Sequence, residues 1–193
     1  MKTAFVDVDS QLDFLYPAGA LYVPGEERIV PAVAHLNRYA AARCIPLIST
    51  VDAHFEDDPE FRVWPRHCVA GTIGQHKAEA TLLEKRVVIP NRECDLAIEG
   101  AQQIIIEKQT VDVFLAPNLP RVVELTGAQH FVVYGVVTEI CVLYAARGLL
   151  RLGKKVSVVS DAIKGLNATD SERALAEIRA AGGTVATVAD IAG

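Results

Sequence analysis

Three residues suited to nucleophilic catalysis each follow a short apolar segment of the sequence: Asp9, Lys108 and Cys141. A cysteine attacks as a thiolate, a form that a helix N-terminus and a nearby ammonium group both favour. We expect Cys141 in the first turn of a helix capped by Thr138, with Lys108 supplying the positive charge. Asp9 could accept the thiol proton and return it to a leaving amine, while backbone N–H groups around Val137 and Cys141 form an oxyanion hole. Each of these residues alone is more often structural, so the hypothesis depends on the fold bringing them together.

A carboxylate and two imidazoles form a second group of side chains that could take part in chemistry. Asp52 and His54 occupy alternate positions, so in an extended chain their side chains point the same way, and His67 follows in the segment WPRHCVAGT. One carboxylate and two imidazoles, with room left for water or substrate, suit zinc, iron or manganese. The D-x-H pattern is weak alone, but together with His67 it predicts a divalent metal site.

Alternating β-rich and helical segments must position these residues. Six apolar, β-branched segments are predicted as strands: 3–8, 45–51, 103–107, 131–137, 156–160 and 184–188. Four segments with helical spacing of apolar residues are predicted as helices: 26–43, 118–127, 139–152 and 171–183. Between them, residues 52–101 form a long irregular stretch, which we expect to be functional because it contains Trp64 and three histidines.

The strands are continuous Val/Ile runs, which is typical of a parallel sheet covered on both faces. Together with the alternation of elements, this predicts an α/β fold: a three-layer αβα architecture with a doubly wound, mainly parallel six-stranded sheet. A Rossmann-like strand order of 3-2-1-4-5-6 makes the first and fourth strands neighbours. Ligands bind beyond the carboxyl ends of strands where the order reverses. We therefore expect Asp9 and Cys141 to face each other across a crevice.

Length and composition exclude several classes of protein. The 193 residues are 51% hydrophobic, enough to bury a core, so residues 1–193 are expected to form a single domain rather than a disordered chain. Four cysteines without a C-x-x-C pair argue against a disulfide scaffold and favour a reducing, cytoplasmic compartment. Lys and Arg are scattered and the net charge is −5, so no nucleic-acid partner is expected. No signal peptide or membrane-spanning run is present, so no membrane association is expected.

Five segments resemble the isochorismatase-like cysteine hydrolases, and most closely the nicotinamidases among them. Residues 9–14 (DSQLDF) match a D-x-Q-x-D-F motif, and 52–54 (DAH) with 64–72 (WPRHCVAGT) match a metal segment of the form D-x-H … W-P-x-H-C-x-x-G-T. Residues 107–114 (EKQTVDVF) resemble the lysine segment, and 135–142 (GVVTEICV) a G-V-x-T-x-x-C-V nucleophile elbow. The segments occur in the family's order, and WPxHCxxGT favours nicotinamidases over metal-free isochorismatases.

The resemblance implies a catalytic triad of Asp9, Lys108 and Cys141. It also implies a cis peptide bond between Val136 and Val137, placing the N–H groups of Val137 and Cys141 in an oxyanion hole. The implied reaction is amide hydrolysis through a Cys thioester, from nicotinamide and water to nicotinate and ammonia.

For the metal and the substrate, the resemblance implies a divalent ion on Asp52, His54 and His67. Zinc is the first expectation, with iron or manganese as alternatives, and the metal would bind the pyridine nitrogen directly or through water. Phe14 and Trp64 would sandwich the aromatic ring. Because relatives are often dimers or tetramers, a homo-oligomer is expected as well.

The sequence departs from the nicotinamidase pattern at three places. Some relatives have a further metal-binding histidine after D-x-H, whereas residues 55–61 (FEDDPEF) offer only carboxylates, including Asp57 and Asp58. Residues 109–118 lack the tyrosine that many nicotinamidases have near the substrate. Ile140 stands where several relatives have Tyr or His. These departures leave two alternatives open: a sibling amidohydrolase for another small amide, such as a carbamoyl or maleamate-like compound, and a non-catalytic binding protein.

Overall fold

A single parallel β-sheet forms the centre of the molecule. The computed structural model describes residues 1–193, and its sheet has the strand order β3-β4-β2-β1-β5-β6-β7, with every neighbouring pair parallel. The strands are β1 (Thr3–Val8), β2 (Leu47–Asp52), β3 (Arg86–Ile89), β4 (Gln103–Lys108), β5 (His130–Val136), β6 (Lys155–Lys164) and β7 (Thr184–Ala186). Without β3, this order is the predicted 3-2-1-4-5-6, so the doubly wound fold is confirmed.

The prediction of six strands missed β3, which lies at the edge of the sheet beside β4. Its sequence is only RVVI, and it falls within the stretch 52–101 that we expected to be irregular. Arg86 and Val88 are exposed, as suits an edge strand covered on one side only. The segment therefore lacks the continuous buried Val/Ile signal that marks the inner strands.

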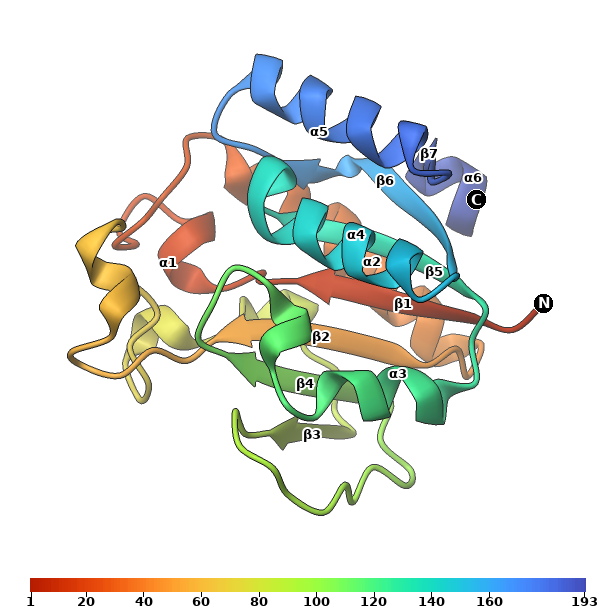
Figure 1. The fold of residues 1–193 in the computed structure, drawn as a ribbon, viewed down its shortest axis with the longest axis horizontal. Helices are drawn as coiled ribbons and strands as arrows, with labels where there is room; N and C mark the ends of the chain where they lie inside the picture. Colours follow the sequence, from red (N-terminus) through yellow and green to blue (C-terminus); the bar gives the residue numbers. More distant parts are fainter.

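Helices cover both faces of the sheet (Figure 1), which confirms the three-layer architecture. The helices are α1 (Leu12–Leu15), α2 (Val30–Ala42), α3 (Leu119–Thr126), α4 (Leu143–Arg151), α5 (Ala168–Ala180) and α6 (Val188–Ala192). In Figure 1, α3 and α4 lie in front of the sheet and α2 lies behind it, where α6 contacts α2. Because both faces are covered, the inner strands are buried throughout, and Ile48, Phe131 and Val133 have no exposed surface.

Most predicted boundaries lie close to those observed; the start of α2 and the end of the last strand differ, whereas the end of α3 agrees. A 3-10 turn (Glu26–Ile29) precedes α2, whose first turn contains Pro31 as its sequence requires. The final strand ends at Ala186, and α6 follows it where a continuing strand was predicted. Helix α3 ends at Gly127, which adopts φ +62° in the left-handed region.

The strand order reverses between β1 and β5, which pair along their whole length. The chain leaves β1 at Asp9 and leaves β5 toward Cys141, so both residues lie at the carboxyl end of the sheet. This is the crevice in which ligands bind in doubly wound folds. None of the helices has the length and apolar composition needed to cross a lipid bilayer.

Candidate active site

Asp9, Lys108 and Cys141 meet in the crevice although they come from three separate segments. The Lys108 Nζ lies 3.0 Å from Asp9 Oδ2 and 3.7 Å from Cys141 Sγ. Asp9 and Cys141 line the same cavity. All three side chains are buried, so an acid–base group, an ammonium and a thiol share one water-poor space.

Local backbone structure aims Asp9 into the crevice. Asp9 follows β1 with φ +47°, a left-handed conformation that Asp tolerates better than most residues. Thr50 on β2 holds the side chain by donating a hydrogen bond to Asp9 Oδ1 at 2.6 Å. On the neighbouring strand, Gly135 has φ +117°, and a Cβ there would lie 2.0 Å from the carbonyl oxygen of Val8. The close approach of β5 to β1 therefore requires glycine at this position.

Cys141 lies in a π-helical turn (Thr138–Val142) that leads directly into α4. The expected N-cap role of Thr138 is wrong: Val137 occupies the cap position, and no side chain caps the turn. Thr138 is itself buried within the turn. The peptide bond between Val136 and Val137 is cis, and both residues line the same cavity as Cys141.

The protonation states in this cluster differ from the sequence-based expectation. Burial raises the pKa of Cys141 well above its usual range, and the nearby carboxylates add to this effect against the opposing charge of Lys108. This direction runs against the expectation that Lys108 and the helix start hold Cys141 as a thiolate, which stays a prediction. Burial also raises the pKa of Asp9, reinforced by the charge of Asp52 and opposed by Lys108. Burial therefore favours the protonated forms of both Cys141 and Asp9.

Asp52 connects this cluster to the metal-ligand residues. Lys108 donates a hydrogen bond to Asp52 Oδ1 as well as pairing with Asp9. Burial alone would raise the pKa of Asp52, but the Lys108 ammonium and the His67 imidazole outweigh it and lower this pKa to about 2. Burial would lower the pKa of Lys108, yet its carboxylate neighbours raise it well above the usual range. Lys108 is therefore a fixed cation that holds two carboxylates.

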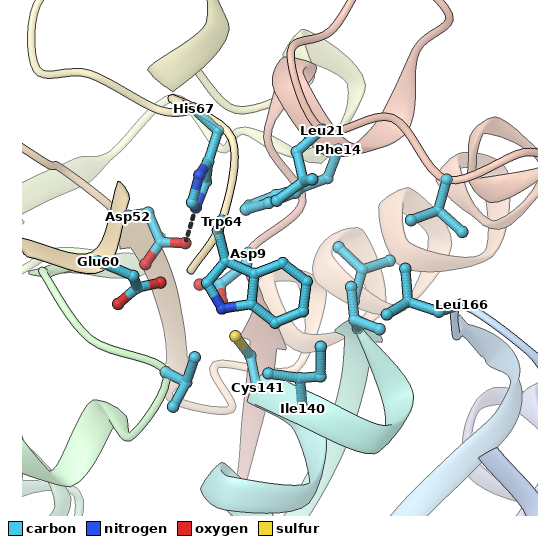
Figure 2. A pocket seen from close by; sticks show the side chains of 14 residues that line it. Asp9, Phe14, Leu21, Asp52, Glu60, Trp64, His67, Ile140, Cys141 and Leu166 are labelled. Carbon is cyan, nitrogen blue, oxygen red and sulfur yellow. Dashed lines mark ion pairs between the residues drawn. The ribbon is translucent and has the colours of Figure 1, made fainter. Parts of the chain in front are cut away.

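Asp52, His54 and His67 bring one ligand atom each within 4.8 Å of one another. The Nε2 of His67 lies 3.8 Å from Asp52 Oδ2, the pair marked by a dashed line in Figure 2. The Nε2 of His54 lies 3.9 Å from Asp52 Oδ1, is buried, and has no hydrogen-bond partner. A buried, unpaired imidazole nitrogen facing a carboxylate and a second imidazole is the donor set that a divalent cation satisfies. The residues present therefore fit a metal ion.

The other nitrogen of each imidazole is held by a neighbour, which orients both rings. The His54 Nδ1 lies 3.0 Å from Asp58 Oδ2, and the His67 Nδ1 lies 2.7 Å from the Pro65 carbonyl oxygen. Such contacts fix the tautomer with Nε2 free to bind a metal. Asp58 is thus an orienting partner of His54 rather than a further ligand, and Asp57 is exposed outside the cluster.

Two residues outside the predicted set of site residues also belong to this site. Glu60 lines the cavity with its Oε1 4.0 Å from His54 Nε2, at the edge of the ligand cluster. Gln11 clamps Asp52: its Oε1 accepts from the Asp52 N–H at 2.7 Å, and its Nε2 donates to the Asp52 carbonyl at 2.8 Å. The D-x-Q-x-D-F motif contains Gln11, but only the fold reveals what it holds.

One cavity joins the two groups, since Asp9 and Cys141 line it together with Asp52 and His67. Phe14 and Trp64, the two aromatic residues predicted to contact substrate, both line it, and Figure 2 shows them around a space bounded by Cys141, Asp9 and His67. The lining is mostly apolar and consists of Asp9, Phe14, Leu21, Val23, Asp52, Glu60, Trp64, His67, Val111, Val136, Val137, Ile140, Cys141 and Leu166. A small, mainly apolar molecule here would touch a nucleophile and the metal-ligand cluster together.

Comparison with known proteins agrees with this arrangement. Residues 3–190 match the family model described as the isochorismatase domain. The chain is 26% identical to the nicotinamidase of Escherichia coli K12 over 213 aligned positions, covering 97% of this chain and 95% of that protein.

Two solved structures share the fold. The pyrazinamidase of Pyrococcus horikoshii, in complex with zinc, is 30% identical with a TM-score of 0.81, covering 97% of this chain and 99% of that one. The N-carbamoylsarcosine amidase of Thermoplasma acidophilum is 25% identical with a TM-score of 0.82, and each chain is covered completely.

Proposed function

Because this chain belongs to the isochorismatase family, whose model spans nearly all of it, we propose that it is a metal-containing cysteine amidohydrolase that converts nicotinamide and water into nicotinate and ammonia. Residues 1–193 would act as one hydrolase domain. The observation that carries the proposal is the shared cavity, in which Cys141 and Asp9 face the same apolar space as Asp52 and His67. Similarity to the nicotinamidase of Escherichia coli supports the choice of substrate.

In the first half of the reaction, the Cys141 sulfur attacks the amide carbonyl carbon. Asp9, which lines the same cavity, accepts the thiol proton, and its raised pKa suits it to return this proton to the departing ammonia. The N–H groups of Val137 and Cys141 are proposed to stabilise the carbonyl oxygen as it becomes negative. The C–N bond breaks and a thioester to Cys141 remains.

In the second half, a water molecule attacks the thioester carbonyl. Asp9 removes a proton from this water, the C–S bond breaks, and the Cys141 sulfur takes the proton back to restore the thiol. Lys108 stays charged throughout, because Asp9 and Asp52 raise its pKa. Its role is to hold Asp9 in place and to balance the negative charge that moves between Asp9 and Cys141.

The proposed metal ligands are Asp52, His54 and His67. A divalent ion bound there, with zinc as the first candidate and iron or manganese as alternatives, would supply a Lewis-acidic anchor for the pyridine nitrogen, directly or through water. Phe14 and Trp64 are proposed to contact the two faces of the ring. Similarity to a pyrazinamidase solved with zinc supports this assignment.

The charge of the cavity favours a neutral substrate. No Lys or Arg lines it, whereas Asp9, Asp52 and Glu60 do. A substrate that carries its own carboxylate would meet these acidic groups without a free side-chain cation, since Lys108 is already paired with Asp9 and Asp52, and only the proposed metal ion could pair with it. Nicotinamide is neutral and planar, so it suits the apolar walls better than a carbamoyl amino acid or a maleamate-like compound.

The second candidate is a sibling amidohydrolase for another small amide. The observation that favours it is the aliphatic wall of Val111, Ile140 and Leu166, together with 25% identity to an N-carbamoylsarcosine amidase. That wall contains none of the polar or aromatic groups that the resemblance to nicotinamidases leads us to expect. The two candidates share the reaction and differ only in the amide.

Ammonia release from a panel of amides distinguishes the candidates. The purified protein, loaded with Zn²⁺, Mn²⁺ or Fe²⁺, is assayed with nicotinamide, N-carbamoylsarcosine and maleamate, and the Cys141→Ala variant serves as the control. We expect the highest kcat/KM for nicotinamide and no release by the variant. Turnover of N-carbamoylsarcosine or maleamate without turnover of nicotinamide would establish the sibling reaction. If none of the three amides releases ammonia, the result would favour a binding protein.

Two further expectations remain predictions. All four cysteines are free, which suits a reducing cytoplasmic compartment. A homo-oligomer is predicted from the resemblance, and light scattering at working concentration measures the subunit number directly.

A further inference from the structure

Asp13 is neither a member of the triad nor a metal ligand, yet its carboxylate joins two loops that build the site. It lies in the short helix α1 and is only 9% exposed. Its Oδ2 accepts a hydrogen bond from the Cys68 N–H at 2.6 Å, and its Oδ1 accepts one from the Ala20 N–H at 2.9 Å. One side chain thus satisfies two backbone donors that are far apart in the sequence.

We propose that Asp13 is a positioning residue that couples the metal-ligand loop to the wall of the substrate cavity. Its carboxylate would set the affinity for the metal through one loop and the affinity for substrate through the other. The inference rests on the proposed function, because it assumes that the cavity binds an amide and the cluster binds a metal.

Through Cys68, Asp13 acts on both histidines. Cys68 directly follows His67 in the chain, and its carbonyl oxygen accepts a hydrogen bond from the His54 N–H at 3.1 Å. The His54 carbonyl in turn accepts from the Ala70 N–H at 2.9 Å. Cys68 has φ +44°, an uncommon conformation for a residue other than glycine, so neighbouring contacts must hold it. The bond from Cys68 to Asp13 is the shortest of these contacts.

Through Ala20, Asp13 acts on the cavity wall. Leu21 follows Ala20, lines the cavity, and donates its N–H to the Asp13 carbonyl at 3.1 Å. Phe14 follows Asp13, and its carbonyl accepts from the Val23 N–H at 3.3 Å. Phe14, Leu21 and Val23 all line the cavity. Their positions therefore depend on a segment that the Asp13 side chain and backbone hold together.

Two glycines leave room for Asp13. A Cβ at Gly74 would lie 2.2 Å from the Asp13 carboxylate, and a Cβ at Gly19 would lie 2.3 Å from its carbonyl oxygen. Neither contact is compatible with the observed position of Asp13. A Gly74→Ala change should therefore push the Asp13 carboxylate out of position without removing it. It perturbs the same contacts independently of a change at Asp13 itself.

The Asp13→Asn change tests the role directly. A carboxylate offers acceptors on both oxygens, whereas an amide offers one oxygen and an NH₂ group that would face a backbone N–H. We expect the affinity for Zn²⁺ to fall about 10- to 100-fold, the range found when partners that orient metal ligands are altered. KM for nicotinamide should rise as well. With saturating Zn²⁺ and nicotinamide, kcat should change far less, because the triad does not contact Asp13.

Zn²⁺ affinity is measured by competition with a fluorescent chelator, and KM and kcat are measured on the same preparations. Ile178→Ala is the matched control, since it empties a fully buried position in α5 and lowers stability without touching either loop. It should keep the wild-type Zn²⁺ affinity and KM despite a lower Tm.

Zn²⁺ affinity and KM that stay within about twofold of wild type in Asp13→Asn and Gly74→Ala would overturn the proposal. The same losses in Ile178→Ala at an equal drop in Tm would also overturn it, by showing that lower stability alone suffices. If Asp13→Asn does not fold, Gly74→Ala decides. Failure of the proposed function is distinguishable, because a wild-type protein that releases no ammonia from nicotinamide still reports Zn²⁺ affinity.

Discussion

The buried carboxyl group of Glu26 should make the stability of the protein depend on pH. It is fully buried at the start of the 3-10 turn before α2, and neither carboxylate oxygen has a hydrogen-bond partner. Burial raises the pKa of Glu26 from 4.5 to about 9, with Glu139 and Glu27 adding to the effect and Lys164 opposing it. The native protein therefore keeps the Glu26 proton at neutral pH, whereas the unfolded chain releases it near the ordinary value.

The sign of the effect follows from proton binding in the two states. Between pH 4.5 and about 9 the native state holds one more proton at Glu26 than the unfolded state does, so stability falls as pH rises through this window. The slope approaches about 1.4 kcal/mol per pH unit. From about pH 5 to about pH 8 the loss is about 4 kcal/mol, a large part of the ~5–15 kcal/mol that typically stabilises a protein.

The Glu26→Gln variant removes this titration while keeping the shape of the side chain. Free energies of unfolding are measured by urea denaturation at both pH values, and the wild type should lose about 4 kcal/mol more than the variant between them. The contributions of other groups cancel in this comparison. Glu27→Gln, at the partly exposed neighbouring position, should retain most of the wild-type pH dependence, with a small decrease because the Glu27 charge adds to the raised pKa of Glu26. Equal pH dependence in Glu26→Gln and wild type would refute the reasoning.

Three further predictions concern the site itself. Cys141→Ala should lower ammonia release by more than about 10³-fold while leaving the circular dichroism spectrum and metal content unchanged; activity within tenfold of wild type would exclude Cys141 as nucleophile. His54→Ala should reduce the metal content from about one ion per chain to nearly none by elemental analysis, and an ion that persists would refute the ligand assignment. Gly135→Ala should destabilise the protein by more than about 3 kcal/mol, because its Cβ would lie 2.0 Å from the Val8 carbonyl oxygen; an unchanged Tm would contradict this reading.

The inner strands could be predicted because burial on both faces leaves a plain trace in the sequence. β1 and β5 are mainly apolar runs, and β1 leads to Asp9 and β5 to the turn that contains Cys141. The switch point between them followed from the order of a doubly wound sheet. β3 left no such trace, since an edge strand of four residues with exposed Arg86 and Val88 resembles a loop.

The sequence predicted the residues that carry reactive or metal-binding groups. It did not predict the residues that hold those groups in place. The spacing of Asp52, His54 and His67 pointed to a metal, but the clamp by Gln11 depends on how the chain after β1 lies against the end of β2. The same limit applies to the protonation state of Cys141. Its pKa is set mainly by burial among carboxylates, a property of the folded molecule that a helix-start motif does not encode.

The central claim is that Cys141 forms a thioester with the acyl group of the amide. Mass spectrometry of protein quenched with acid during nicotinamide turnover tests it directly, followed by digestion to locate any adduct. The account predicts one nicotinoyl group on the peptide that contains Cys141, removed by hydroxylamine and absent from Cys141→Ala. Continued turnover of nicotinamide by Cys141→Ala, or an adduct confined to another cysteine, would contradict it.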